Sequence, residues 1–150
     1  DAGKYKGRRL IENKYDRIRP TTDKVRQALF VKLQFFVPEA RVLDLFCGTG
    51  AMGIEALSRG ASEVVFVDKD ERSVQMTKAN LKNLGITAKV NKCDACTFLD
   101  KVEGQFDLIV LDPPYKSGLY EKVLEKIYEK NLLANEGIIV CEHATEDTFN

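Results

Sequence analysis

Short apolar runs alternate with helical periodicity along most of the chain. Runs rich in β-branched and aromatic residues predict buried strands over residues 42–46, 63–68, 89–93, 106–111 and 137–141. Apolar residues three or four apart predict helices over 51–59, 71–84 and 120–128, a brief one near 98–102, and one that begins at Thr21 or Thr22 and ends before Pro38. Because strands and helices alternate, we expect a doubly wound parallel sheet that binds its ligands at the carboxyl ends of the strands.

The first 20 residues differ from the rest. Residues 4–19 show no helical period and contain two basic clusters with glycine, so we expect a short hairpin or an irregular arm there, followed by one domain over residues 21–150. Residues 1–26 carry nine basic and four acidic side chains, whereas the whole chain has 23 of each and no net charge. A basic segment on an acidic body is typical of phosphate contacts, although an ordinary solvated surface gives the same pattern.

A glycine-rich turn follows the first predicted buried strand. Gly48, Gly50 and Gly53 have the spacing G-x-G-x-x-G, which predicts a sharp strand-to-helix turn whose backbone comes close to a ligand. Asp44 precedes this turn, and a carboxylate at its mouth would repel phosphate and attract a cation. Asp68 lies 20 residues after Gly48 at the end of the second strand, the spacing of a carboxylate that accepts ribose hydroxyls. We therefore expect a ligand with a ribose and a positively charged end.

The sequence Asp112-Pro113-Pro114-Tyr115 follows the predicted strand at 106–111. The two prolines end that strand and hold a carboxylate and an aromatic ring at its carboxyl end. If the Asp112 carboxylate and the Pro113 carbonyl accept the hydrogens of an exocyclic amine, its lone pair becomes localised on nitrogen, while Tyr115 offers a face for base stacking. This combination resembles the S-adenosylmethionine-dependent methyltransferases that modify amino groups of bases. A dinucleotide-dependent dehydrogenase shares the glycine turn and Asp68 but has no use for this second motif.

The resemblance extends over nearly the whole chain. Four segments carry it: GKYKGRRL at 3–10, RPTTDKVR at 19–26, LDLFCGTGAMGIEALSRGA at 43–61 and LDPPYKSGLY at 111–120. They resemble the RsmD family of bacterial 16S rRNA guanine-N2 methyltransferases. The resemblance implies a class I S-adenosylmethionine-dependent methyltransferase fold, S-adenosylmethionine as cofactor, and a guanine of 16S rRNA in an assembled small-subunit particle as substrate.

Three groups of site residues are expected from the motifs and the resemblance together. Those expected to bind the cofactor are Asp44, Phe46, Gly48, Gly50, Asp68, Asp94 and Ala95. Those expected to act in catalysis are Asp112, Pro113 and Tyr115. Those expected to contact RNA are Lys6, Arg8, Arg9, Arg19, Thr21 and Arg26. Asp94 and its neighbour would meet the adenine, although an aspartate there serves equally well as a helix cap.

Several alternatives and expectations accompany this interpretation. A DNA or RNA adenine-N6 methyltransferase uses the same second motif, but the DNA enzymes generally carry additional sequence that reads the target site. A binding module without turnover is expected to have a broken catalytic motif, and here the motif is intact. We expect a cytoplasmic protein without a bound metal, four cysteines serving as small reduced core residues, and a chain that lacks the closing hairpin with which family members usually continue.

Overall fold

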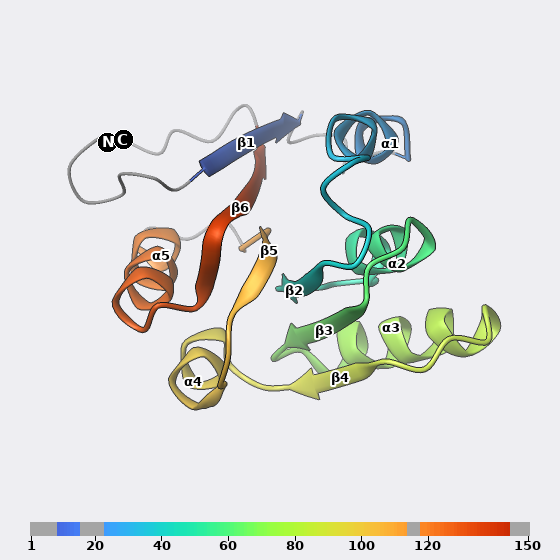
Figure 1. Cartoon of the computed structure of the whole chain (residues 1–150). Coiled ribbons are helices and arrows are strands. Elements are labelled where there is room, and N and C mark those ends of the chain that lie inside the picture. Colours follow the sequence, from blue (N-terminus) through green and yellow to red (C-terminus); the bar gives the residue numbers. More distant parts are fainter. Residues whose placement is uncertain (1–8, 16–22, 114–117, 145–150) are drawn as a thin grey trace.

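The computed structural model describes residues 9–15, 23–113 and 118–144. Its strands form one six-stranded parallel sheet in the order β1-β6-β5-β2-β3-β4 (Figure 1). The strands are β1 (Arg9–Tyr15), β2 (Arg41–Leu45), β3 (Glu63–Asp68), β4 (Lys89–Lys92), β5 (Phe106–Leu111) and β6 (Leu133–Ala144). The helices are α1 (Asp23–Lys32), α2 (Ala51–Ser58), α3 (Glu71–Asn83), α4 (Ala95–Lys101) and α5 (Leu119–Glu129). The doubly wound parallel fold is confirmed.

The strands and helices predicted after residue 20 are all present, and they differ from the prediction only at their ends. β3 and β5 have the bounds that the apolar runs predicted, because each run is closed by polar residues. α1 is shorter than predicted: it ends at Lys32, and hydrogen-bonded turns carry the chain through Leu33 and Phe36 to Pro38. β6 is longer, since it begins at Leu133 and contains a register shift against β5. Apolar periodicity therefore located the elements but not every boundary.

The expectation of an irregular arm is wrong for residues 9–15, while the expectation of a hairpin stays a prediction because residues 1–8 lie outside the described part. Residues 9–15 form β1, which pairs parallel with β6 from Arg9 opposite Ile138 to Tyr15 opposite Ala144. The segment RLIENKY has too few apolar residues to reveal a strand by itself, and it becomes one because β6 offers it a line of backbone hydrogen-bonding groups. Residues 1–8 and 16–22 lie outside the described part, so the division of the chain at residue 20 stays a prediction.

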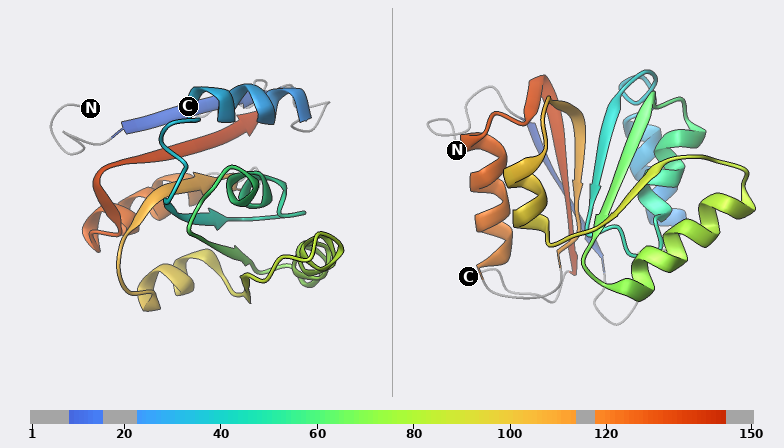
Figure 2. Two further views of the ribbon diagram at one scale, coloured as in Figure 1. Left: turned by 45° about the vertical axis from the view of Figure 1, so that its right-hand side comes forward. Right: turned by 90° about the horizontal axis from the view of Figure 1, so that it is seen from below.

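Helices cover both faces of the sheet. α1, α2 and α3 lie on one face, and α4 and α5 lie on the other (Figure 2). On the first face Phe30 and Ala56 pack with strand residues such as Phe66, and on the second Leu99 and Ile127 pack with others such as Leu43. This double burial explains why the central strands are apolar at nearly every position. Among the described residues, no helix has the length and apolar character needed to span a membrane.

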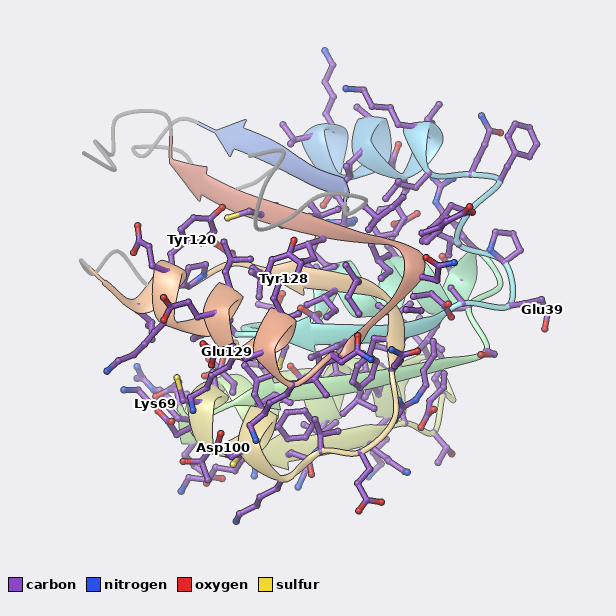
Figure 3. All side chains as sticks on the ribbon, turned by 60° about the vertical axis from the view of Figure 1, so that its left-hand side comes forward. Glu39, Lys69, Asp100, Tyr120, Tyr128 and Glu129 are labelled. Carbon is purple, nitrogen blue, oxygen red and sulfur yellow. The ribbon has the colours of Figure 1, made fainter. Side chains whose placement is uncertain are left out.

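The order of the strands determines where a ligand can bind. β2 and β5 are neighbours at the centre, and the chain builds outward from β2 to β3 and β4 but in the opposite direction from β5 to β6. Helices that leave these two strands on opposite faces diverge, which opens a crevice at the carboxyl ends of the strands. Figure 3 shows Lys69, which follows β3, at that end of the molecule, and Glu39, which precedes β2, at the other.

Candidate active site

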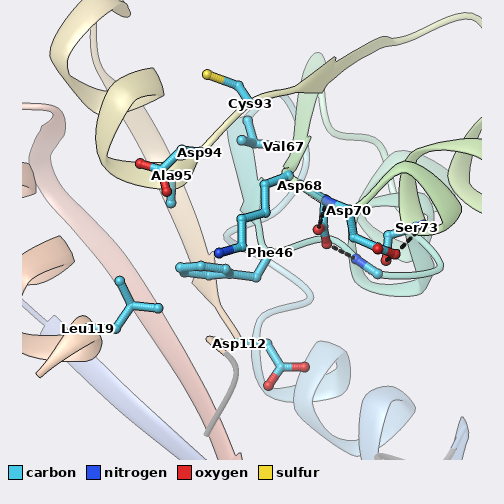
Figure 4. Close-up of a pocket in the computed structure, with 12 residues that line it drawn as sticks. Phe46, Val67, Asp68, Asp70, Ser73, Cys93, Asp94, Ala95, Asp112 and Leu119 are labelled. Atoms are coloured by element: carbon cyan, nitrogen blue, oxygen red, sulfur yellow. Dashed lines mark hydrogen bonds between the residues drawn. The ribbon is translucent and has the colours of Figure 1, made fainter. Parts of the chain in front are cut away.

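A cavity of about 470 Å³ lies at the carboxyl ends of β2, β3, β4 and β5 (Figure 4). This volume falls within the usual range of small-molecule sites, about 300 to 1,000 Å³. The cavity brings together six of the predicted site residues: Phe46, Gly48, Asp68, Asp94, Ala95 and Asp112. They come from four strand ends that are up to 66 residues apart in the sequence, so the fold has assembled one site from separate motifs.

The turn formed by residues 47–50, hereafter the glycine turn, has an unusual backbone. Phe46, directly before it, has a φ of 67°, and Gly48 and Gly50 have φ values of 56° and 83°. Glycine adopts this left-handed region at little cost, whereas for phenylalanine it stores strain of the kind that gathers at functional sites. A Cβ added to Gly48 would meet no atom within 4 Å, so the space beside Gly48 in the cavity is open to a ligand.

Asp68 is fixed by two backbone donors. Its Oδ2 accepts a hydrogen bond from the N–H of Gly48 at 3.0 Å, and its Oδ1 accepts one from the N–H of Asp70 at 3.0 Å. A carboxylate offers about four lone-pair sites, so these two bonds orient the group and leave acceptor capacity for a ligand. Asp70 instead acts as a helix cap, the second role that an aspartate after a strand can have. Its Oδ2 accepts a hydrogen bond from the N–H of Ser73 at 2.9 Å at the start of α3.

Replacing these two aspartates separates binding from folding. Asp68→Ala should weaken S-adenosylmethionine binding by about 1 to 3 kcal/mol, the usual cost of losing hydrogen bonds to a charged acceptor. Asp70 also lines the cavity, but its carboxylate is engaged by Ser73, so Asp70→Ala should remove the helix cap, lower the free energy of unfolding by about 1 kcal/mol and affect affinity much less. Calorimetric titration and urea unfolding measure the two effects. Wild-type affinity in Asp68→Ala would show that the ribose site is misplaced.

Asp94 combines the two roles that the sequence left open. Its Oδ2 accepts from the N–H of Thr97 at 3.1 Å and caps α4, while the same residue lines the cavity. Ala95 is buried and begins α4, so its N–H belongs to the first turn, where the amides lack partners within the helix. An acceptor and a donor are therefore adjacent at this end of the cavity. Contact with an adenine stays a prediction.

Asp112, the first residue of the second motif, lies at the opposite side of the cavity from Asp94 (Figure 4). β5 ends at Leu111, so the strand stops before the two prolines as predicted. Asp112 follows directly, is half-buried and lines the cavity, and Pro113 is half-buried beside it. Pro114 and Tyr115 lie outside the described residues, so the stacking role of Tyr115 stays a prediction. The carboxylate of the motif is nevertheless in the same cavity as Asp68.

Asp44 lies deeper than expected. Its side chain is only 2% exposed, and Oδ2 accepts from the N–H of Gly53 at 2.9 Å, so the carboxyl lies under the glycine turn instead of at its mouth. Burial raises the pKa of Asp44 well above its ordinary value, and the carboxylates of Glu142, Asp112 and Asp68 raise that pKa further, while the Gly53 N–H lowers it. A raised pKa disfavours the charged form that would attract a cation, so binding of a ligand ammonium by Asp44 stays a prediction.

Sequence reasoning missed Glu142. This residue is 1% exposed and belongs to β6, and its charge acts on Asp44. The available signal was an acidic residue directly after the apolar run of residues 138–141. Asp44, Asp112 and Glu142 thus form an acidic group at the ends of β2, β5 and β6.

The cysteines are free thiols. Cys47 and Cys141 are buried in the two core clusters, which confirms their prediction as small core residues. Burial raises the pKa of Cys47 to about 12, and the nearby charge of Asp44 adds to this effect. Cys47 is therefore protonated at neutral pH and is a poor nucleophile. Cys93 and Cys96 are only partly buried, and Cys93 lines the cavity.

At two positions of the motif, packing within the protein requires glycine, independently of any contact with a ligand. A Cβ at Gly50 would lie 2.9 Å from Cγ2 of Thr77, so the close neighbour of Gly50 is helix α3 and not the cavity. A Cβ at Gly53 would overlap the ring of Phe66, which shows that Gly53 allows α2 to pack closely on β3. Gly50 therefore supports the turn, and a direct contact with the cofactor stays a prediction.

The predicted RNA contacts are mostly undescribed. Four of these residues lie outside the described part of the chain: Lys6, Arg8, Arg19 and Thr21. Arg9 is the first residue of β1, but the position of its side chain is not described. Arg26 does have a described position: Nε donates to Glu55 at 3.3 Å and Nη1 donates to Asp23 at 2.9 Å. Burial raises the pKa of Glu55, but the hydrogen bonds from Arg59 and Arg26 outweigh it and leave the pKa below its ordinary value. Arg26 thus links α1 to α2, and its contact with RNA stays a prediction.

Comparison with known proteins identifies the family. The family model described as "Conserved hypothetical protein 95" matches residues 1–150. The chain is 43% identical to the "Putative rRNA methyltransferase YlbH" of Bacillus subtilis, over 97% of this chain and 82% of that protein, and 34% identical to the "Ribosomal RNA small subunit methyltransferase D" of Escherichia coli, over 97% and 74%. The solved structure titled "Putative methyltransferase yhhF from Escherichia coli" has a TM-score of 0.76 at 36% identity, and covers 81% of this chain and 68% of that one. The chain therefore belongs to the RsmD family and has the class I S-adenosylmethionine-dependent methyltransferase fold.

Proposed function

We propose that this protein transfers a methyl group from S-adenosylmethionine to the exocyclic N2 amino group of a guanine in 16S rRNA. The observation that carries the proposal is that Asp112, from the amino-methylation motif, lines the same cavity as Asp68 and Asp94, from the expected cofactor site. The names of the relatives support rRNA of the small subunit as the substrate class. The choice of guanine N2 rests on the resemblance of the motifs.

The residues of the cavity fit S-adenosylmethionine, which supplies a methyl group on a positively charged sulfur. Asp68 retains acceptor sites for the two ribose hydroxyls, and the open space beside Gly48 admits the chain that connects the ribose to the amino acid end. Phe46, Val67 and Leu119 supply apolar surface, with Asp94 and Ala95 next to it. Apolar walls with a few fixed polar groups are typical of small-molecule sites.

The second motif would prepare the amine for attack. The lone pair of an exocyclic amine is delocalised into the base, and acceptance of its hydrogens by Asp112 and by the Pro113 carbonyl localises that pair on nitrogen. Tyr115 would stack on the base after it has been extruded from the RNA. The proton can leave after the methyl group has moved, so Asp112 need not be a strong base. Most of the rate enhancement then comes from holding nitrogen and methyl carbon in line.

One labelling experiment tests the proposal. The protein is incubated with S-adenosylmethionine carrying a radiolabelled methyl group and with naked 16S rRNA, small ribosomal subunits or DNA, and the modified nucleoside is then identified. We expect N2-methylguanosine from RNA, with small subunits or their assembly intermediates as the best substrate. N6-methyladenosine from any substrate would support the alternative adenine methyltransferase, and cofactor binding without any labelled product would support a binding module. A cytoplasmic location and activity without added metal belong to the same proposal.

The amino-terminal basic segment is expected to hold RNA phosphates. Replacing Lys6, Arg8 and Arg9 with alanine should flatten the plot of log affinity against log salt concentration by up to about three units if each makes a phosphate contact. The matched control removes three exposed lysines in the last turns of α1, α3 and α4, none of which lines the cavity: Lys32, Lys82 and Lys101. The control changes the net charge by the same amount. If both triple variants give the same slope of log affinity against log salt concentration, the amino-terminal segment is ordinary solvated surface and makes no phosphate contacts.

A further inference from the structure

Two side chains of α3 hold the carbonyl groups of the glycine turn. Thr77 donates its hydroxyl hydrogen to the Gly48 carbonyl oxygen at 2.8 Å, and Asn80 donates from its side-chain amide to the Thr49 carbonyl oxygen at 2.9 Å. Thr77 is 0% exposed and is one of three buried polar or charged side chains in the described part of the chain. A buried hydroxyl is retained where its hydrogen bond matters, because an unpaired one would be costly.

Gly48 is consequently held on both sides. Its N–H donates to Asp68 Oδ2 at 3.0 Å, while its carbonyl oxygen accepts from Thr77. Gly48 has a φ of 56°, and even an added Cβ would find no neighbour within 4 Å, so side-chain packing does not restrain this residue. The two hydrogen bonds fix the two peptide planes that flank its Cα. One of the two hydrogen bonds that orient the Asp68 carboxylate is therefore linked, through Gly48, to the hydroxyl of Thr77, while the other comes from the N–H of Asp70.

We infer that Thr77 is a positioning residue for the cofactor, which acts through Gly48 on Asp68, and that Asn80 supports the same turn at Thr49. The inference rests on the proposed function, because it takes Asp68 to hold the ribose of S-adenosylmethionine. A glycine turn that samples other conformations binds its ligand more weakly, because the apparent Kd is the intrinsic Kd divided by the fraction of time that the turn spends in the competent conformation. Thr77 and Asn80 keep the turn in the competent conformation before the cofactor arrives.

The hydroxyl and the methyl group of Thr77 have separable roles. The hydroxyl binds Gly48, whereas the methyl carbon Cγ2 packs near Gly50, where an added Cβ would lie 2.9 Å away. Thr77→Val keeps the size of the side chain and removes the hydroxyl, with its hydrogen bond to Gly48 and its 3.4 Å contact with Cys47 Sγ. Thr77→Ser keeps the hydroxyl and removes the methyl group. A role limited to packing would make serine the more harmful change, while a positioning role makes valine the more harmful one.

Titration calorimetry of the full chain with S-adenosylmethionine tests the inference. Thr77→Val should raise Kd by about 3- to 10-fold, the net value of one hydrogen bond, and Thr77→Ser should recover most of the affinity. Asn80→Ala removes the hydrogen bond to the Thr49 carbonyl group and should raise Kd by about 2- to 5-fold. Because Asn80 is only half-buried, this variant tests the support of the glycine turn with less disturbance of the core than a change at Thr77. Thr87→Val makes the same chemical change at an exposed position after α3 and should leave Kd unchanged.

A double-mutant cycle distinguishes positioning from general support of the fold. If Thr77 acts through Asp68, the effect of Thr77→Val on Kd should shrink to less than about twofold in the Asp68→Ala background. The same fold-change in both backgrounds would overturn the inference, as would a larger loss in Thr77→Ser than in Thr77→Val. Wild-type protein that does not bind S-adenosylmethionine would overturn the proposed function, and the inference with it. If the wild type binds S-adenosylmethionine normally and the variants do not change Kd as expected, the inference is wrong but the proposed function is not contradicted.

Discussion

Asp112→Ala should lower turnover by about 10²- to 10⁴-fold, which is the range for loss of one positioned polar catalytic group. Asp112 follows the end of β5 and lines the cavity beside the residues expected to bind the cofactor. Its carboxylate would accept the hydrogens of the target amine and so localise the lone pair that attacks the methyl carbon. Because the aspartate is not the ribose acceptor, cofactor affinity should change much less than turnover. Single-turnover rates and calorimetric titration separate the two quantities.

Two further variants sharpen this prediction. Asp112→Asn keeps a carbonyl acceptor but loses the negative charge, so its turnover should fall between those of the wild type and the alanine variant. Asp100→Ala removes an exposed aspartate of α4 that pairs with Lys126 at 2.8 Å, away from the cavity, and should leave turnover unchanged. A fully active Asp112→Ala enzyme would contradict the mechanism. A parallel fall in cofactor affinity and turnover would instead make Asp112 part of the cofactor site.

What the sequence could predict was local. The apolar runs of β3 and β5 are closed by polar residues, so each strand could be bounded from its own sequence, and Asp70 could be recognised as a cap because it directly precedes the periodicity of α3. The site was also predictable in outline. Motifs at the ends of parallel strands must meet at one edge of the sheet, and Phe46, Asp68, Asp94 and Asp112 do line one cavity.

What the sequence could not predict depends on contacts between distant segments. β1 is a strand because β6 lies beside it, and its own residues do not show a strand pattern. Asp44 is buried in the folded chain, and this burial raises the pKa of a carboxyl that was expected at the mouth of the turn, although the hydrogen bond from the Gly53 N–H acts in the opposite direction. Thr77 lies 29 residues from the carbonyl group it holds, and within α3 it looks like any other residue on the buried face.

Gly50→Val should reduce cofactor affinity by at least about 100-fold, and the structure changes the reason for this expectation. The sequence suggested that a side chain here would fill the space of the ligand. Instead, a Cβ would lie 2.9 Å from Cγ2 and 3.1 Å from Oγ1 of Thr77, which is itself buried. The residue also has a φ of 83°, where an L-residue loses about 1 to 2 kcal/mol. Overpacking adds about 1 to 3 kcal/mol, so the variant should also unfold more easily.

Gly85→Ala is the matched control for this variant. Gly85 follows α3 with a φ of 69°, and an added Cβ would meet no atom within 4 Å, so the substitution introduces backbone strain without a clash. It should lower the free energy of unfolding by about 1 to 2 kcal/mol and leave Kd for S-adenosylmethionine unchanged. Urea unfolding and calorimetry on both variants then separate strain from damage to the site. Equal affinity in Gly50→Val and the wild type would mean that the glycine turn does not contact the cofactor. A loss of affinity confined to Gly50→Val would mean that cofactor binding depends on the conformation of the glycine turn, which packs against Thr77 of α3.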